Sequence, residues 1–84
     1  MGRSSSYLVY GRSSCPYCTE STQLLDFAGA DYDFFDLESD REFLEEAKQF
    51  YKHPTVPIVL KIDGESGRVM LIGGCDDLKG ELSD

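Results

Sequence analysis

Residues 7–18 read YLVYGRSSCPYC and combine an apolar run, a polar loop and a pair of cysteines. The stretch begins with a nearly all-apolar run of strand length, which is typical of a strand buried on both faces. A polar loop follows, and Cys15-Pro16 then opens a helical stretch, because proline suits the first helical position. The stretch therefore predicts a strand, a loop and a helix that carries Cys15 and Cys18 at its N-terminal end.

The following segment predicts a second strand and a second helix. Residues 32–37 are rich in aromatic side chains, as strands often are. Ser39 and Glu42 match a capping box at the start of the next helix. The apolar stripe of that helix is expected to consist of Phe43, Ala47, Phe50 and Tyr51.

The C-terminal part predicts two more strands and a short helix. Residues 57–62 and 68–72 have strand composition and are separated by a turn over 63–67. Gly73-Gly74 ends the last strand, and Cys75 begins the final helix. The order β-α-β-α-β-β-α places the chain in the α/β class, with a four-stranded mixed sheet flanked by helices.

We expect one domain over residues 7–84, preceded by a leader over residues 1–6. The leader is small and polar, and we expect it to be poorly ordered. It also fits a loose N-myristoylation pattern at Gly2, but a flexible leader is the simpler interpretation.

The chain is strongly acidic, with a net charge of -8 from 8 Lys+Arg and 16 Asp+Glu. This balance argues against binding to nucleic acid and to an anionic membrane surface. Half of the acidic residues fall between Asp31 and Glu46, where Arg41 is the only base. We interpret this segment as a solvated face, and a docking surface for basic partners is the alternative.

The three cysteines, Cys15, Cys18 and Cys75, indicate a reducing compartment. An odd number of cysteines without a secretory signal does not fit a disulfide-stapled secreted domain. The apolar stretches are also far shorter than a bilayer span. We therefore expect a cytoplasmic protein, and a monomer by default.

Cys15-Pro16-Tyr17-Cys18 is the motif that indicates a reactive site. Two thiols at positions i and i+3 of a helix lie on one face, close enough to form a disulfide, and next to a βαβ pattern this spacing indicates a redox site. Cys15 lies at the helix N-terminus, where N–H groups and the helix dipole favour a thiolate. Cys18 lies one turn further in and should be less exposed. Cys15 is thus the expected nucleophile and Cys18 the resolving thiol.

Metal binding is the alternative interpretation of the cysteine pair. A tetrahedral zinc site needs four ligands, and only Cys75 and His53 could complete one. These two are lone residues in unrelated contexts, so we expect no metal. An iron–sulfur cluster shared between two chains is a further alternative.

Two other motifs are suited to holding a peptide. In Thr55-Val56-Pro57, a cis Val56–Pro57 bond would expose the Val56 backbone to an extended peptide such as glutathione, whereas a trans proline is the ordinary alternative. In Gly73-Gly74-Cys75-Asp76-Asp77, the glycines allow close approach, and the helix start could bind a carboxylate. The two aspartates could accept hydrogen bonds from an ammonium group or simply cap the helix.

Together the three motifs, Cys15-Pro16-Tyr17-Cys18, Thr55-Val56-Pro57 and Gly73-Gly74-Cys75-Asp76-Asp77-Leu78, resemble those of dithiol glutaredoxins, in the same order and at similar spacing. The resemblance runs from about Tyr7 to Leu78. It implies the thioredoxin fold, a cis Val56–Pro57 bond and a groove for glutathione between the motifs.

The resemblance also implies roles for single residues. Tyr17 would flank glutathione, and Val56 would pair with its cysteinyl backbone. Cys75 and Asp76 would hold its γ-glutamyl end. The full set of glutathione-binding residues implied is Arg12, Tyr17, Lys52, Thr55, Val56, Pro57, Gly74, Cys75, Asp76 and Asp77.

Two cations complete this assignment. Arg12 stands three residues before Cys15, where such glutaredoxins usually have lysine, and it keeps a positive charge near the thiolate. Lys52 lies close to the position that usually meets the glycyl carboxylate of glutathione.

The resemblance implies a glutathione-dependent thiol–disulfide oxidoreductase acting in cell redox homeostasis. Its substrates would be protein disulfides and glutathionylated proteins, with ribonucleotide reductase among the candidates. The alternatives are a thioredoxin-like protein served by a reductase, an iron–sulfur carrier and an inert binding module. Pro16-Tyr17 between the cysteines and the Gly-Gly-Cys-Asp-Asp segment favour the glutaredoxin.

Overall fold

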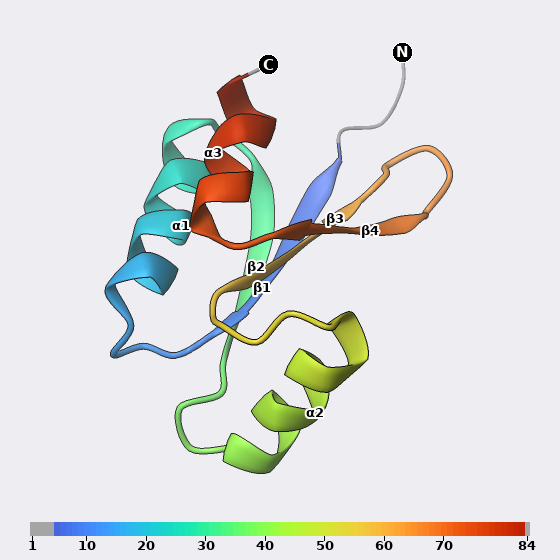
Figure 1. The fold of residues 1–84 in the computed structure, drawn as a ribbon. Coiled ribbons are helices and arrows are strands. Elements are labelled where there is room, and N and C mark those ends of the chain that lie inside the picture. The colour runs from blue at the N-terminus through green and yellow to red at the C-terminus, as the bar shows by residue number, and fades with distance from the viewer. Residues whose placement is uncertain (1–4, 84) are drawn as a thin grey trace.

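The computed structural model describes residues 5–83, and its elements follow the predicted order (Figure 1). The strands are β1 (Ser6–Gly11), β2 (Asp31–Asp36), β3 (Ile58–Ile62) and β4 (Val69–Gly73). The helices are α1 (Pro16–Phe27), α2 (Arg41–Tyr51) and α3 (Cys75–Ser83). The predicted leader falls mainly outside the described residues, while Ser6 already belongs to β1.

The four strands form one mixed sheet in the order β2-β1-β3-β4. β1 and β2 are parallel, as expected for strands joined through α1, and β3 runs antiparallel to both β1 and β4. The carboxyl ends of β1 and β2 therefore lie at the same edge, where the loop before α1 meets the β2–α2 connection (Figure 1). This edge carries the cysteine pair. The α/β class and the thioredoxin fold are confirmed.

The sheet separates two apolar clusters because side chains alternate along each strand. Val9 and Val59 point to one face, where they pack against Leu25 of α1 and Leu78 of α3. The opposite face carries the second cluster, in which Ala47 of α2 packs with partners from β1 and β3. Those partners include Leu8, Tyr10, Ile58 and Leu60. Figure 1 shows α1 and α3 together on one side and α2 on the other.

The start of α2 differs from the prediction by one residue. Asp40, not Ser39, is the N-cap, and its carboxylate accepts a hydrogen bond from the Phe43 N–H at 3.1 Å. The expected capping box between Ser39 and Glu42 is therefore wrong. An aspartate caps a helix as well as a serine does, so adjacent capping residues leave the boundary ambiguous in sequence.

The buried face of α2 matches the expected stripe only in part, because Ala47 is buried and Tyr51 packs against the same cluster. Leu44 and Ala47 are its buried residues, whereas Phe50 is 78% exposed and Phe43 is 46% exposed. Phe50 thus faces mostly solvent, whereas the Phe43 ring lies 6.2 Å from the Tyr10 ring of β1 and covers part of the sheet. Within residues 5–83 the structure contains no helix that is long and apolar enough to span a membrane.

Candidate active site

Cys15 occupies the N-cap of α1. Its backbone is extended (φ -89°, ψ 119°), and Pro16 follows at the first helical position. The Cys15 carbonyl accepts the N–H groups of Cys18 and Thr19 at 3.1 and 3.2 Å, which starts the helix. The thiol is half-buried and lies beside the N-terminal turn of α1, whose first N–H groups have no partner within the helix. The geometry suits a nucleophile.

Cys18 is fully buried, one turn into α1. Burial is the main reason that the pKa of its thiol is raised to about 12. Its Sγ accepts the backbone N–H of Arg12 at 3.4 Å, which opposes this shift. Cys18 is therefore a protonated thiol at neutral pH. This state fits a residue that acts after Cys15, as the sequence predicted.

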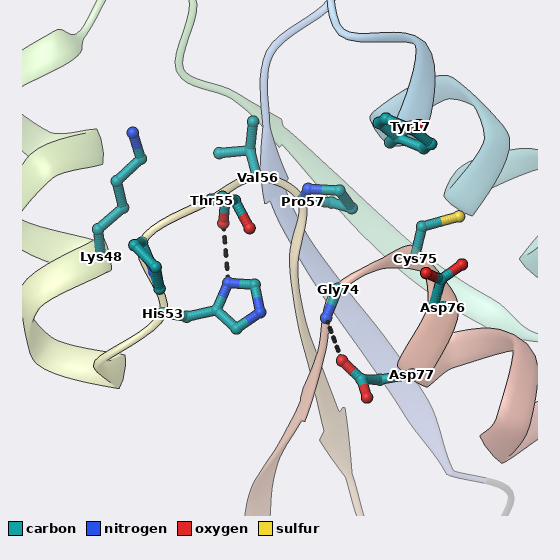
Figure 2. Close-up of a pocket in the computed structure, with 11 residues that line it drawn as sticks. Tyr17, Lys48, His53, Thr55, Val56, Pro57, Gly74, Cys75, Asp76 and Asp77 are labelled. Carbon is teal, nitrogen blue, oxygen red and sulfur yellow. Dashed lines mark hydrogen bonds between the residues drawn. The ribbon is translucent and has the colours of Figure 1, made fainter.

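A groove of about 570 Å³ lies between the N-terminal turn of α1, the segment before β3 and the start of α3. Of the ten residues predicted to bind glutathione, eight line it. These are Tyr17, Thr55, Val56, Pro57, Gly74, Cys75, Asp76 and Asp77. Figure 2 shows that they come from three segments far apart in sequence. The Val56–Pro57 peptide bond is cis, as expected.

The cation in this groove is Lys48, not Lys52. Lys52 is the C-cap of α2 with a left-handed backbone (φ 54°), and its exposed side chain faces a neighbouring hollow beside Gln49. Lys48 lies one helical turn earlier and reaches the groove, where Figure 2 shows it across from Asp76. The groove thus has a positive end on α2 and a negative end on α3. The family resemblance pointed to Lys52, just before His53-Pro54, and no sequence signal singled out Lys48.

Arg12 also lies outside the groove, in a polar hollow beside it. Its guanidinium forms an ion pair with Glu38 at 2.8 Å. This contact is the main reason that the pKa of Arg12 is raised, and the Cys15 and Cys18 sulfurs add to the shift. Arg12 therefore stays within electrostatic range of the active-site sulfurs, as predicted, but its side chain is held by a carboxylate.

The start of α3 uses part of the third motif for its own structure. The Asp77 carboxylate accepts the Gly74 N–H at 3.0 Å, so Asp77 caps the helix (Figure 2). The buried Cys75 thiol donates to Glu20 of α1 at 3.1 Å. Burial raises the pKa of this thiol, so it remains protonated and links α3 to α1. Asp76 is left exposed at the negative end of the groove.

His53 is a second groove residue that was not expected there. Its Nδ1 lies 2.8 Å from the Thr55 carbonyl oxygen, a contact that orders the turn before the cis bond (Figure 2). Cys75 and His53, the candidates for completing a zinc site, thus have other partners. Within residues 5–83 no three His, Cys, Asp or Glu side chains gather as metal ligands.

Comparison with known proteins identifies the family. The sequence profile described as Glutaredoxin matches residues 8–66. A glutaredoxin from Vernicia fordii is 39% identical over 80 residues, which cover 92% of this chain and 71% of that protein. Glutaredoxin 1 from Rickettsia prowazekii is 36% identical over 75 residues, covering 84% of this chain and 70% of that protein.

Solved glutaredoxin structures have the same fold as this chain. The buckwheat glutaredoxin–glutathione complex superposes with a TM-score of 0.76 at 26% identity, covering 95% of this chain and 70% of that one. Glutaredoxin 1 from Francisella tularensis gives a TM-score of 0.65 at 28% identity, covering 95% and 94%.

The sheet, the helix order and the paired cysteines at the start of α1 define a dithiol protein of thioredoxin fold. The chain belongs to the glutaredoxin family. This membership supports a role as a thiol–disulfide oxidoreductase.

Proposed function

We propose that this protein is a glutathione-dependent oxidoreductase that reduces glutathione mixed disulfides and protein disulfides through Cys15. The observation that carries the proposal is the groove beside the N-terminal turn of α1, which has Lys48 at one end and Asp76 at the other. Glutathione is an extended tripeptide with a carboxylate at its glycyl end. Its γ-glutamyl end carries an ammonium group and a second carboxylate.

The groove offers a complementary partner for each part of glutathione. Lys48 can pair with the glycyl carboxylate, as a charge-assisted contact. The Val56 backbone can pair with the cysteinyl residue in the manner of an added strand. The N-terminus of α3 favours the γ-glutamyl carboxylate, and Asp76 can accept from the ammonium group. Tyr17, which is 62% exposed, would cover the ligand from the α1 side.

The first route uses Cys15 alone. The Cys15 thiolate attacks the glutathionyl sulfur of a protein–glutathione mixed disulfide, so a Cys15–glutathione disulfide forms and the protein thiolate leaves. The leaving thiolate takes a proton from water. A second glutathione thiolate then attacks the glutathionyl sulfur on Cys15. Glutathione disulfide leaves, and the Cys15 thiolate is regenerated.

The second route uses both cysteines. Cys15 attacks one sulfur of a protein disulfide and forms a mixed disulfide with that protein. Cys18 then loses its proton and attacks the Cys15 sulfur, which releases the reduced protein and leaves a Cys15–Cys18 disulfide. Two glutathiones reduce this disulfide in turn. Burial of Cys18 keeps its thiol away from disulfides in solution, so the mixed disulfide on Cys15 is the disulfide within its reach.

We also propose that the protein works in the cytoplasm. Each cycle must start from a reduced Cys15, and a glutathione-rich reducing compartment maintains that state.

The test is turnover of a glutathione mixed disulfide with glutathione, glutathione reductase and NADPH. Wild type, Cys15→Ser and Cys18→Ser are compared. We expect Cys15→Ser to be inactive and Cys18→Ser to remain active, since the first route needs only Cys15. An inactive wild type that reduces protein disulfides with a thioredoxin reductase would show that the groove does not serve glutathione.

A further inference from the structure

Glu38, two residues after β2, makes four hydrogen bonds to the loop that precedes Cys15. Its Oε1 accepts from the Ser14 N–H at 3.1 Å and from the Ser14 hydroxyl at 2.5 Å. Its Oε2 accepts from Arg12 Nε at 3.1 Å and Nη2 at 2.8 Å. One carboxylate thus joins two loop residues that are close to the nucleophile in sequence and in space.

The rest of the loop depends on the same connection. Asp36 Oδ1 accepts the N–H groups of Ser13 and Glu38 at 3.1 and 3.0 Å. The side chains of residues 12–14 are all exposed, so apolar packing does not fix the loop. Its shape therefore comes from hydrogen bonds to Asp36 and Glu38, together with the bond from the Arg12 N–H to Cys18 Sγ. Figure 1 shows these two connections meeting at one edge of the sheet.

We propose that Glu38 is a positioning residue that sets the ionisation of Cys15 through Arg12. The Glu38 carboxylate holds the Arg12 guanidinium in an ion pair at 2.8 Å, and the Arg12 carbonyl accepts the Cys15 N–H at 3.1 Å, so this paired charge lies one hydrogen-bonded turn from the nucleophile. Removing the Glu38 charge leaves the whole Arg12 charge to the thiolate. This inference relies on the proposed function only in taking Cys15 as the attacking thiol.

Three further charged side chains lie around this ion pair. Arg41, Glu45 and Lys48 of α2 line the hollow that contains Arg12 and Glu38. Glu45 is paired with Lys48 at 3.1 Å and does not hold Arg12. Asp36 binds backbone N–H groups, and Cys18 is protonated. Among the described residues, Glu38 is the carboxylate in an ion pair with Arg12.

The experiment measures the rate of Cys15 alkylation by iodoacetamide as a function of pH, on reduced protein without glutathione. Peptide mass spectrometry identifies the modified cysteine. Glu38→Gln keeps an oxygen for Ser14 and loses the charge that faces Arg12. We expect its alkylation midpoint to move to lower pH by roughly 0.3–1 unit. Glu42→Gln, an exposed carboxylate on α2 with no contact to the loop, should leave the midpoint unchanged.

A double-mutant cycle isolates the contribution of Arg12. In an Arg12→Gln background, Glu38→Gln should move the midpoint by less than half as much as it does in wild type. A shift of at least half the wild-type size would show that Glu38 acts directly on the thiolate. An unchanged or raised midpoint in the single variant would also overturn the proposal.

A fold measurement and a second variant complete the experiment. Circular dichroism of each variant verifies the fold, and Arg12→Gln breaks the same ion pair from its exposed side if Glu38→Gln does not fold. Because alkylation needs no glutathione, it still tests Glu38 if the turnover assay fails.

Discussion

Cys18 lies directly against Gly11, the last residue of β1. A Cβ atom on Gly11 would stand 2.5 Å from Cys18 Sγ, closer than side-chain contacts allow, and 3.2 Å from Cys18 Cβ, which is a tight contact. The absence of a side chain at Gly11 therefore makes room for the resolving thiol. The Arg12 N–H next to it donates to the same sulfur at 3.4 Å. The end of β1 thus forms the wall of the Cys18 pocket.

Gly11→Ala should destabilise the protein by about 1–3 kcal/mol, because the added methyl group overpacks this wall. Urea denaturation of the reduced protein measures the change. Gly80→Ala is the matched control, since a Cβ there meets nothing within 4 Å. In the exposed middle of α3 it should stabilise by up to about 1 kcal/mol. Equal stability of Gly11→Ala and wild type would contradict the packing described.

The three thiols should differ strongly in reactivity. At neutral pH, iodoacetamide should modify Cys15 at least about a hundredfold faster than Cys18, because burial keeps Cys18 protonated and inaccessible. Cys75 should also react slowly, since it is buried and its pKa is raised. Peptide mapping after timed alkylation measures the three rates. In denaturant the differences should largely disappear, and comparable native rates would argue against the assigned roles.

Lys48 and Lys52 provide a direct test of the positive end of the groove. Lys48→Gln should raise the KM for glutathione by roughly fivefold, as expected for a loss of about 1 kcal/mol from a partly exposed ion pair. Lys52→Gln should leave the KM unchanged, because Lys52 faces the neighbouring hollow. Steady-state kinetics on both variants shows which of the two lysines contributes to glutathione binding. A larger effect at Lys52 would restore the assignment made from sequence.

Glu38 should make stability depend on pH in acid. Hydrogen bonds from the Ser14 side chain, and next from Arg12, lower its pKa to about 2, from an ordinary value of 4.5. A lowered pKa gives stability that is present above about 4.5 and is lost as the pH falls toward about 2. Thermal unfolding across this range should fall less steeply for Glu38→Gln than for wild type or Glu42→Gln. Parallel curves would contradict the contribution assigned to Glu38.

Much of the fold could be predicted because local signals agree with the tertiary structure. Pro16 marks the start of α1, and Gly29, with φ +70°, follows the end of that helix. Residues 7–10 and the apolar run in β3 have the composition of central strands. Val9 and Val59, one in each run, are fully buried. The cysteine spacing singled out Cys15 and Cys18, and the structure places both in the first turn of α1.

The features that could not be predicted depend on where helices end and how they rotate. Lys48 and Lys52 are four residues apart, and only the left-handed backbone at Lys52 separates their directions. Phe50 looked like a core residue but faces solvent, because α2 contacts the sheet through Leu44 and Ala47. These outcomes depend on tertiary packing.

Glu38 was not among the residues predicted from the sequence, although its position just after β2 is a signal that could have found it. The carboxyl ends of two adjacent parallel strands meet at one edge, so a carboxylate just after the second strand lies near the loop after the first. That argument would have placed Glu38 beside the loop that precedes Cys15. Its four hydrogen bonds could be assigned only from the structure.

The most direct test of the central claim is to trap the intermediate on Cys15. Reduced Cys18→Ser protein is treated with glutathione disulfide and analysed by intact mass and peptide mapping. We predict one glutathionyl group, attached to Cys15, which excess glutathione removes. No adduct, or an adduct on Cys75 in place of Cys15, would contradict the account.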